Sequence, residues 1–245
     1  MRYTAKTDVG RKRENNEDNL YARIYDEDTA LFVVADGLGG YSSGEVASKV
    51  AVNSIRDNFE LNIDVLKKSD EDKVKKFFKE LIQITNQKIY SMQMSNPKYK
   101  GMGTTVVLVG KVNGKIYYES VGDSRLYYID KEIKNIEQIT IDDTYVNELL
   151  KKNLIKKSEV ETHPQKHILT KALGIFDTID LNIDTFIRKD GYLLLCSDGL
   201  TNMLQDEDIL KTVSTTPFDN LAEKFVEKAN ANGGTDNITL ICVEI

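Results

Sequence analysis

Four aspartates stand beside glycine or small polar residues at the ends of apolar runs, where a carboxylate can hold a metal ion. Asp36 and Asp198 each follow such a run and precede a glycine. Asp236 stands in Gly-Gly-Thr-Asp-Asn before the last apolar run, and Asp123 stands in Gly-Asp-Ser-Arg between two others. A carboxylate at the mouth of a packed sheet is costly unless it is paired, exposed or bound to a cation. One Asp-Gly alone is an ordinary turn signal, but four such positions together favour a shared site.

The ligand types restrict the metal. The chain has only two histidines and two cysteines, from which a zinc site would be hard to build. Oxygen ligands suit Mg²⁺ or Mn²⁺, and the glycine beside an aspartate lets a backbone carbonyl join them. Two such ions about 3.5–4 Å apart can lower the pKa of a shared water and clamp a phosphoryl group.

An arginine and two acids lie upstream, in Arg13-Glu-Asn-Asn-Glu17-Asp18. Arginine matches a phosphate with a two-pronged hydrogen bond. A solvated basic turn would explain Arg11-Lys-Arg13 equally well on spacing alone.

Bulk properties exclude several classes of protein. The net charge of −6 argues against a nucleic-acid-binding protein, and against a metal-dependent nuclease, because both need a basic face. No run approaches 18 apolar residues, so we expect no membrane insertion. The polar first 19 residues lack the apolar core of a signal peptide, and the two cysteines give no disulfide framework, so we expect a cytoplasmic protein.

Hydrophobic periodicity predicts clustered strands with separate helices. The expected strands are 3–9, 20–25, 29–35, 104–109, 115–121, 125–129, 181–187, 192–196 and 238–245, and the expected helices are 44–59, 74–94, 206–213 and 220–231. Asn113-Gly114 is a hairpin signal, and Asp123 is expected to join two hairpin strands. Short helical pieces are expected in 140–172. Strands in clusters with tight turns favour antiparallel sheets over a βαβ array.

These motifs, in this order, resemble the bacterial branch of the metal-dependent protein phosphatases of the PPM/PP2C type. The resemblance spans nearly the whole chain and is carried by the 13–18 segment and by VADGLGGYSSGEVAS (34–48), GMGTT (101–105), VGDSR (121–125), ILTKALG (168–174), LLCSDGLT (194–201) and GGTDNIT (233–239). It implies an α+β fold: an αββα sandwich of two antiparallel sheets flanked by helices, forming one domain over 1–245.

The resemblance also implies roles for the core ligands. Asp36 would bridge two Mn²⁺ or Mg²⁺ ions, and the Gly37 carbonyl would bind one of them. Asp198 and Asp236 would complete the first ion's shell. Asp123 would help to hold a third ion together with Asp198.

The other candidates would act around those ions. Glu17 would hold metal-bound water, Asp18 would support it, and Arg13 would bind the substrate phosphate. A flap at about 140–167 would bear on substrate choice and on the third ion.

The implied activity is that of a protein serine/threonine phosphatase. Hydroxide bound to metal would attack phosphorus in one step, without a phosphoenzyme. The implied partners are phosphorylated proteins and a cognate bacterial Ser/Thr kinase, and we expect a monomer.

Two positions depart from the family pattern. Leu38 stands where eukaryotic members carry a histidine proposed as general acid, so a water, or else His163 or His167, would protonate the leaving group. Lys171 replaces a usual arginine, which keeps the charge and loses the fork.

Other chemistries fit the residues less well. A cysteine phosphatase needs an arginine where Asn202 follows Cys196, and a dinucleotide loop needs a glycine where Ser42 stands. A catalytically dead binding protein on the same scaffold would have lost a metal-ligating aspartate, whereas all four are present.

Overall fold

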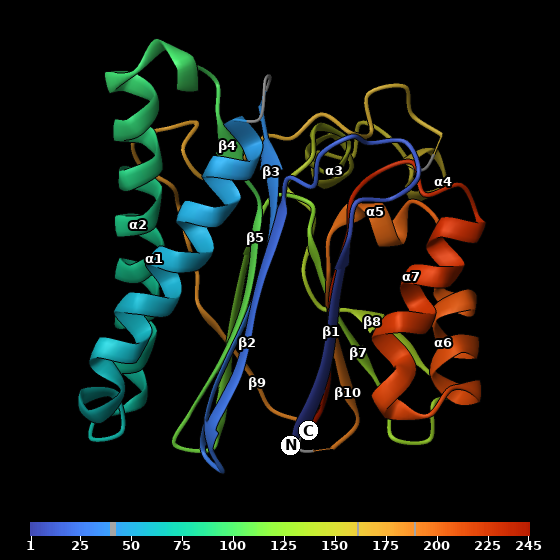
Figure 1. The fold of residues 1–245 in the computed structure, drawn as a ribbon, viewed down its shortest axis with the longest axis horizontal. Helices are drawn as coiled ribbons and strands as arrows, with labels where there is room; N and C mark the ends of the chain where they lie inside the picture. The colour runs from blue at the N-terminus through green and yellow to red at the C-terminus, as the bar shows by residue number, and fades with distance from the viewer. Residues whose placement is uncertain (40–42, 161, 189) are drawn as a thin grey trace.

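The molecule is built from two antiparallel sheets that pack face to face, with helices on both outer faces (Figure 1). The computed structural model describes residues 1–39, 43–160, 162–188 and 190–245. One sheet has the order β1-β11-β10-β7-β8, formed by β1 (Arg2–Asp8), β11 (Ile238–Glu244), β10 (Tyr192–Cys196), β7 (Arg125–Ile129) and β8 (Ile136–Gln138). The other has the order β2-β3-β5-β6-β9, formed by β2 (Asp18–Asp26), β3 (Thr29–Leu38), β5 (Val106–Val112), β6 (Lys115–Val121) and β9 (Asp184–Phe186), with β4 (Gly103–Thr104) paired to β3.

The helices fall into two groups that cover opposite faces of the sandwich (Figure 1). The long α1 (Ser43–Leu66) and α2 (Glu71–Ser95) cover the β2-β3-β5-β6-β9 sheet. The other sheet is covered by α5 (Asp198–Thr201), α6 (Asp206–Thr215) and α7 (Leu221–Ala231). Short helices occur at η1 (Pro97–Tyr99), η2 (Phe218–Asn220), α3 (Tyr145–Lys151) and α4 (Lys157–Val160).

Strand β3 shows why the central strands are apolar without interruption. Alternate residues of a strand point to opposite faces. Leu31, Val33 and Ala35 pack under α1 and α2, whereas Phe32 and Val34 pack between the two sheets. Both faces of this strand are therefore buried, which accounts for the continuous apolar run. The expected αββα sandwich is confirmed.

Three local expectations were wrong. Strand β3 does not end before Asp36 but continues to Leu38, because Gly37 and Leu38 pair with β4. Strands β6 and β7 do not form a hairpin: they lie in different sheets, so the turn 122–124 crosses the sandwich. The strand expected over 181–187 shrinks to β9.

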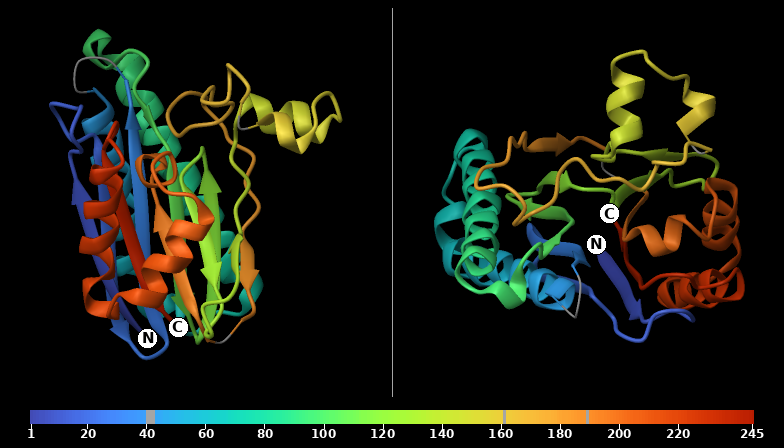
Figure 2. Two further views of the ribbon diagram at one scale, coloured as in Figure 1. Left: turned by 90° about the vertical axis from the view of Figure 1, so that its right-hand side faces the viewer. Right: turned by 90° about the horizontal axis from the view of Figure 1, so that it is seen from above.

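Segment 140–167 stands out from the sandwich and carries α3 and α4 (Figure 2). We call it the projecting segment; residue 161 within it lies outside the described residues. It leaves the sheet after β8 and returns beside the end where the β3 aspartate lies, far from the two chain termini (Figures 1 and 2). Of the helices in the described ranges, none combines the length and the apolar character that crossing a bilayer requires.

Candidate metal and phosphate site

Asp36 is fixed inside β3 by hydrogen bonds of its backbone. Its N–H donates to the Thr105 hydroxyl at 3.0 Å, and its carbonyl accepts from the Thr104 hydroxyl at 2.9 Å and from the Thr105 N–H at 2.8 Å. Asp18 lies directly opposite on β2. Residues opposite one another in an antiparallel pair share a face, so β2 and β3 bring two carboxylates to the same end of the sandwich.

Glycines allow the chain to approach this end closely. A Cβ on Gly37 would meet the Gly44 carbonyl oxygen at 2.2 Å, and a Cβ on Gly44 would meet Glu17 Oε2 at 2.6 Å. The Gly37 N–H donates to the Glu17 carbonyl at 3.2 Å. The start of α1 therefore rests on β3 and on Glu17, which explains the glycines of this motif. Gly40, Tyr41 and Ser42 lie outside the described residues.

Ser197 joins the two sheets beneath the site. Its hydroxyl donates to Asp18 Oδ2 at 2.8 Å and accepts from the Thr239 N–H at 3.0 Å. The next residue, Asp198, begins the single turn α5, where the helix N-terminus favours a negative charge. Asn202 donates to Asp198 Oδ2 at 2.9 Å.

Asp236 and Arg13 form an ion pair at the rim. Arg13 Nη2 donates to Asp236 Oδ2 at 2.8 Å, and the Asn237 N–H donates to Asp236 Oδ1 at 2.9 Å. The charges of Asp236, Asp36 and Glu17 all raise the pKa of Arg13, with the Asp236 hydrogen bond first. The predicted phosphate ligand is therefore brought to the same site as the carboxylates.

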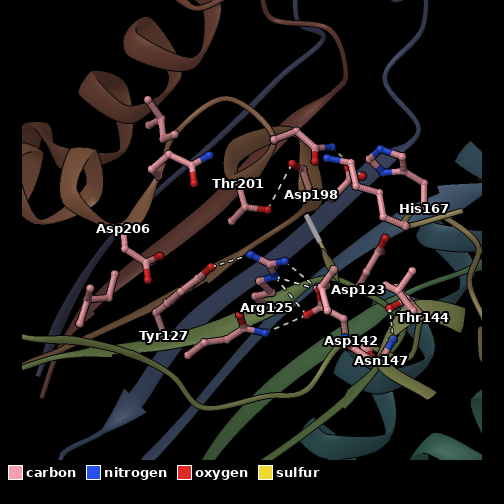
Figure 3. A pocket seen from close by; sticks show the side chains of 18 of the residues that line it. Asp123, Arg125, Tyr127, Asp142, Thr144, Asn147, His167, Asp198, Thr201 and Asp206 are labelled. Atoms are coloured by element: carbon pink, nitrogen blue, oxygen red, sulfur yellow. Dashed lines mark hydrogen bonds and ion pairs between the residues drawn. The ribbon is translucent and has the colours of Figure 1, made fainter. Parts of the chain in front are cut away.

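Asp123 lies in the turn that crosses between the sheets. The hydroxyls of Ser124 and Thr105 are 2.7 Å apart, and Thr105 is the residue that also accepts from the Asp36 N–H. One buried hydroxyl pair thus connects the turn of Asp123 to the strand of Asp36. The next residue after Ser124, Arg125, makes a forked contact with Asp142 and donates to the Tyr127 hydroxyl (Figure 3).

Five carboxyl groups at this end hold their protons more tightly than usual. Burial, and then the charges of neighbouring aspartates, raise the pKa of Asp36 well above its ordinary range and raise that of Asp198. Burial raises the pKa of Asp123 and of Asp18 to about 7. Burial also raises the pKa of Glu17. This mutual repulsion is the cost that a bound cation would remove.

The donor set fits a hard divalent cation. Among the residues that the structure describes, the buried Asp18 Oδ1 and Asp198 Oδ1 have no hydrogen-bond partner, which is uncommon in a folded protein and calls for an ion or a water. In the described part of the chain, no three His, Cys, Asp or Glu side chains already form a cage around one point. The donors are therefore brought together without being preassembled.

A polar cavity of about 630 Å³ opens beside these carboxylates, between the projecting segment and the start of α6 (Figure 3). Asp123 and Asp198 line it, as does His167. His163 lies beside Tyr145 of α3, with the two ring centroids 6.5 Å apart.

Sequence reasoning missed the residues that hold the ligands in place. Its candidates are brought to one end of the molecule. It did not single out Thr105, Ser197, Asn237, Asp142 or Asp143. Thr105, Ser197 and Asn237 do stand inside the motifs named above, and Ser197 and Asn237 are directly beside an aspartate, which was the available signal for those two.

Comparison with known proteins identifies the arrangement. The family model described as protein phosphatase 2C matches residues 9–238. The chain belongs to this family. It is accordingly a protein serine/threonine phosphatase, as the resemblance implied, and the family depends on metal ions.

Relatives agree along the whole length. The protein phosphatase PhpP of Streptococcus pneumoniae is 37% identical over 248 residues, which covers 100% of this chain and 98% of the relative. The solved serine/threonine phosphatase of S. agalactiae is 31% identical, covers 98% of each chain and has a TM-score of 0.87. The catalytic domain of the phosphatase PstP, solved in complex with two manganese ions, is 28% identical with a TM-score of 0.83, and covers 100% of this chain and 98% of that one.

Proposed function

We propose that the chain hydrolyses phosphoserine and phosphothreonine in proteins in one step, at the end of the sandwich where Asp36, Asp198 and Asp236 meet. The observation that supports this proposal is the raised pKa of Asp36, Asp198 and Asp18, together with the buried Oδ1 atoms of Asp18 and Asp198, which have no hydrogen-bond partner among the described residues. Asp36, the Gly37 carbonyl, Asp198 and Asp236 would hold two Mn²⁺ or Mg²⁺ ions. When bound, such ions lower the pKa of a water and neutralise charge on a phosphoryl group.

The surrounding residues bind and orient. Arg13 presents its guanidinium to the substrate phosphate, steered by Asp236. Glu17 and Asp18 stand behind the core ligands and hold water. Asp123 and Asp198 would share a third ion. Leu38 has no proton to give, so a water, or else a histidine such as His167, which lines the cavity, would protonate the leaving group.

The wider setting follows from the same proposal. We take residues 1–245 as one phosphatase domain whose projecting segment is a flap over the cavity. The protein would work as a monomer in a bacterial cytoplasm, where it would reverse the action of a Ser/Thr kinase.

The core test measures hydrolysis of a phosphothreonine peptide. The unmodified protein is assayed with Mn²⁺ and with excess chelator, and three variants are assayed with Mn²⁺. Asp36→Ala and Asp198→Ala should each lower kcat/KM at least about 10³-fold, because they remove cation ligands worth several kcal/mol to the transition state. Asp28→Ala, a carboxylate in the exposed turn between β2 and β3, is the matched control and should keep the activity. Unchanged hydrolysis in chelator would contradict the metal mechanism.

The third ion has a separate test. Asp123→Ala should weaken one Mn²⁺ site and reduce turnover while the two core ions stay bound. Crystals of Asp123→Ala grown in Mn²⁺ should therefore show two ions, and a structure with three filled sites would count against the role of Asp123.

A further inference from the structure

The two ends of the projecting segment meet at Asp143, which is hydrogen-bonded to the residue before Asp123. At the first end, the Asp143 N–H donates to the Gly122 carbonyl at 2.8 Å, and the Gly122 N–H donates back to Asp143 Oδ2 at 3.1 Å. Just after the second end, the Thr170 N–H donates to the Asp143 carbonyl at 2.8 Å. Gly122 directly precedes Asp123, so the first end of the segment is tied directly to the turn that carries this carboxylate, and the second end is tied to it through Asp143.

Lys171 completes the arrangement. Its Nζ lies 3.3 Å from Asp143 Oδ1, and the two side chains are 44% and 20% exposed. One carboxylate oxygen therefore faces the ammonium while the other accepts the Gly122 N–H. A lysine is a point charge with no fork, so its contact occupies one oxygen and leaves the second to the backbone. This gives a physical role to the lysine that stands where an arginine is usual.

The turn itself has little room to adapt. Gly122 has φ +102°, which favours glycine, and a Cβ there would meet Thr105 Cγ2 at 2.7 Å. After Asp123, the Ser124 hydroxyl is tied to Thr105. The chain at Asp123 is thus held on the following side by Ser124 and on the preceding side by Asp143.

We propose that Asp143 is a positioning residue that, held by Lys171, orients Asp123 through the Gly122 amide and so makes metal binding at Asp123 depend on the seating of the projecting segment. The inference rests on the proposed role of Asp123. Groups that orient a metal ligand without touching the metal typically change affinity 10–100-fold when they are removed, and that is the size of effect expected here.

The first measurement needs no metal and no catalysis. Hydrogen exchange of the Gly122 amide, followed by NMR in chelator, should be at least about 10-fold faster in Asp143→Ala, because a hydrogen bond to a charged acceptor is lost. Asp143→Asn keeps an acceptor oxygen and should retain most of the protection. Glu148→Gln breaks the exposed Glu148–Lys152 ion pair of the same segment and is the control that should change nothing.

The second measurement is Mn²⁺ titration followed by the EPR signal of the free ion. Asp143→Ala should weaken the site that Asp123→Ala also weakens, by about 10-fold, and leave the tighter sites as they are. The exchanged pair Asp143→Lys with Lys171→Asp restores an ion pair but not the acceptor for Gly122. It should regain thermal stability without regaining Mn²⁺ affinity.

Two outcomes would overturn the inference. If Asp143→Ala exchanges Gly122 as slowly as the Glu148→Gln control, the carboxylate does not hold the amide. If the exchanged pair recovers full Mn²⁺ affinity, Asp143 acts only as the partner of Lys171. Should Asp123→Ala itself leave Mn²⁺ binding unchanged, the proposed third ion is wrong, while the amide measurement still decides whether Asp143 fixes the turn.

Discussion

The Arg13 guanidinium can contact Asp236 and a phosphate at the same time. Its Nη2 donates to Asp236, and the group has five N–H donors in a fixed fork, so others are available to a phosphate. The side chain is 54% exposed, and an exposed ion pair contributes at most about 1 kcal/mol. The pair with Asp236 therefore steers Arg13 without trapping it.

Replacing Arg13 should impair phosphate binding more than the chemical step. We expect Arg13→Ala to raise KM for a phosphothreonine peptide, and Ki for inorganic phosphate, about 10-fold, since a charge-assisted contact contributes roughly 1.5–3 kcal/mol. Arg13→Lys should give intermediate values of KM and Ki, because it keeps the charge and loses the fork. Steady-state kinetics with phosphate as inhibitor measures both values.

Lys12→Ala is the neighbouring control and should match the unmodified protein. If Arg13→Ala lowered kcat with KM and Ki unchanged, Arg13 would not be the phosphate ligand.

At the residue scale the sequence was most informative. Asp36, Asp198 and Asp236 could be chosen because their residue types and glycine neighbours are written in the chain. The pairing of Arg13 with Asp236 could not, because it joins residues 223 apart and depends on how β11 begins beside the first loop.

Between elements, Asn237 fastens the loop that follows β1 to the start of β11. It accepts from the Glu17 N–H at 2.8 Å, and its amide donates to the carbonyls of Val9 and Asn15 at 2.9 Å. The side chain is buried. Arg13 and Glu17 both belong to this loop, so Asn237 sets their position relative to Asp236.

Loss of Asn237 should loosen that loop. Asn237→Ala removes three hydrogen bonds of a buried side chain to the backbone of the loop, so we expect destabilisation of about 2–4 kcal/mol and a raised KM. Asn237→Asp keeps an acceptor for Glu17 but loses both donors, and should show an intermediate KM. Urea unfolding and peptide kinetics separate the two effects.

Asn232→Ala, which loses one exposed hydrogen bond to Met203, is the control for a surface asparagine nearby. An Asn237→Ala protein with unaltered KM would show that the loop is held by other contacts.

Element boundaries marked by local signals were predictable, and the sheet assignment of neighbouring strands was not. The Gly122 turn has the composition of a hairpin, yet β6 and β7 lie in different sheets because each packs its apolar side against the facing sheet. Asp36 was expected after its strand because Asp-Gly is a turn signal. Pairing with β4, a contact distant in sequence, keeps it inside β3.

At the scale of the molecule, the sandwich concentrates negative charge at one end of an otherwise apolar stack. Each layer places a carboxylate there, from β3, from the β6–β7 turn, and from the chain around β10 and β11. Burial, and then the charges of Asp198 and Asp142, raise the pKa of Asp123 to about 7. Burial and the neighbouring aspartates likewise raise the pKa of Asp36 well above its ordinary range. Without a cation the folded chain therefore holds protons that the unfolded chain releases near pH 4.

This difference sets the sign of the pH dependence in chelator. When folding raises the pKa of a carboxyl group, the folded state binds more protons than the unfolded state between the two pKa values. The free energy of unfolding therefore falls as the pH rises through that interval. The metal-free protein should therefore lose stability between about pH 4 and pH 7, the interval from the ordinary pKa to the folded value. Added Mn²⁺ binds the ionised carboxylates and should reverse the loss, with affinity that rises with pH over the same interval.

The variant Asp123→Asn tests whether the charge of Asp123 causes this loss of stability, because it removes a buried charge and keeps the shape of the side chain. In chelator at pH 8, Asp123→Asn should melt about 3 °C or more above the unmodified protein, the shift that ~1 kcal/mol gives in a chain of this size. In saturating Mn²⁺ this difference in melting temperature should shrink or change sign, since the variant has lost a ligand. Thermal unfolding followed by circular dichroism at pH 5.5 and pH 8 measures all four cases. A metal-free protein that grows more stable from pH 5.5 to pH 8, or an Asp123→Asn protein that melts lower in chelator at pH 8, would show that this carboxylate is not strained by its neighbours.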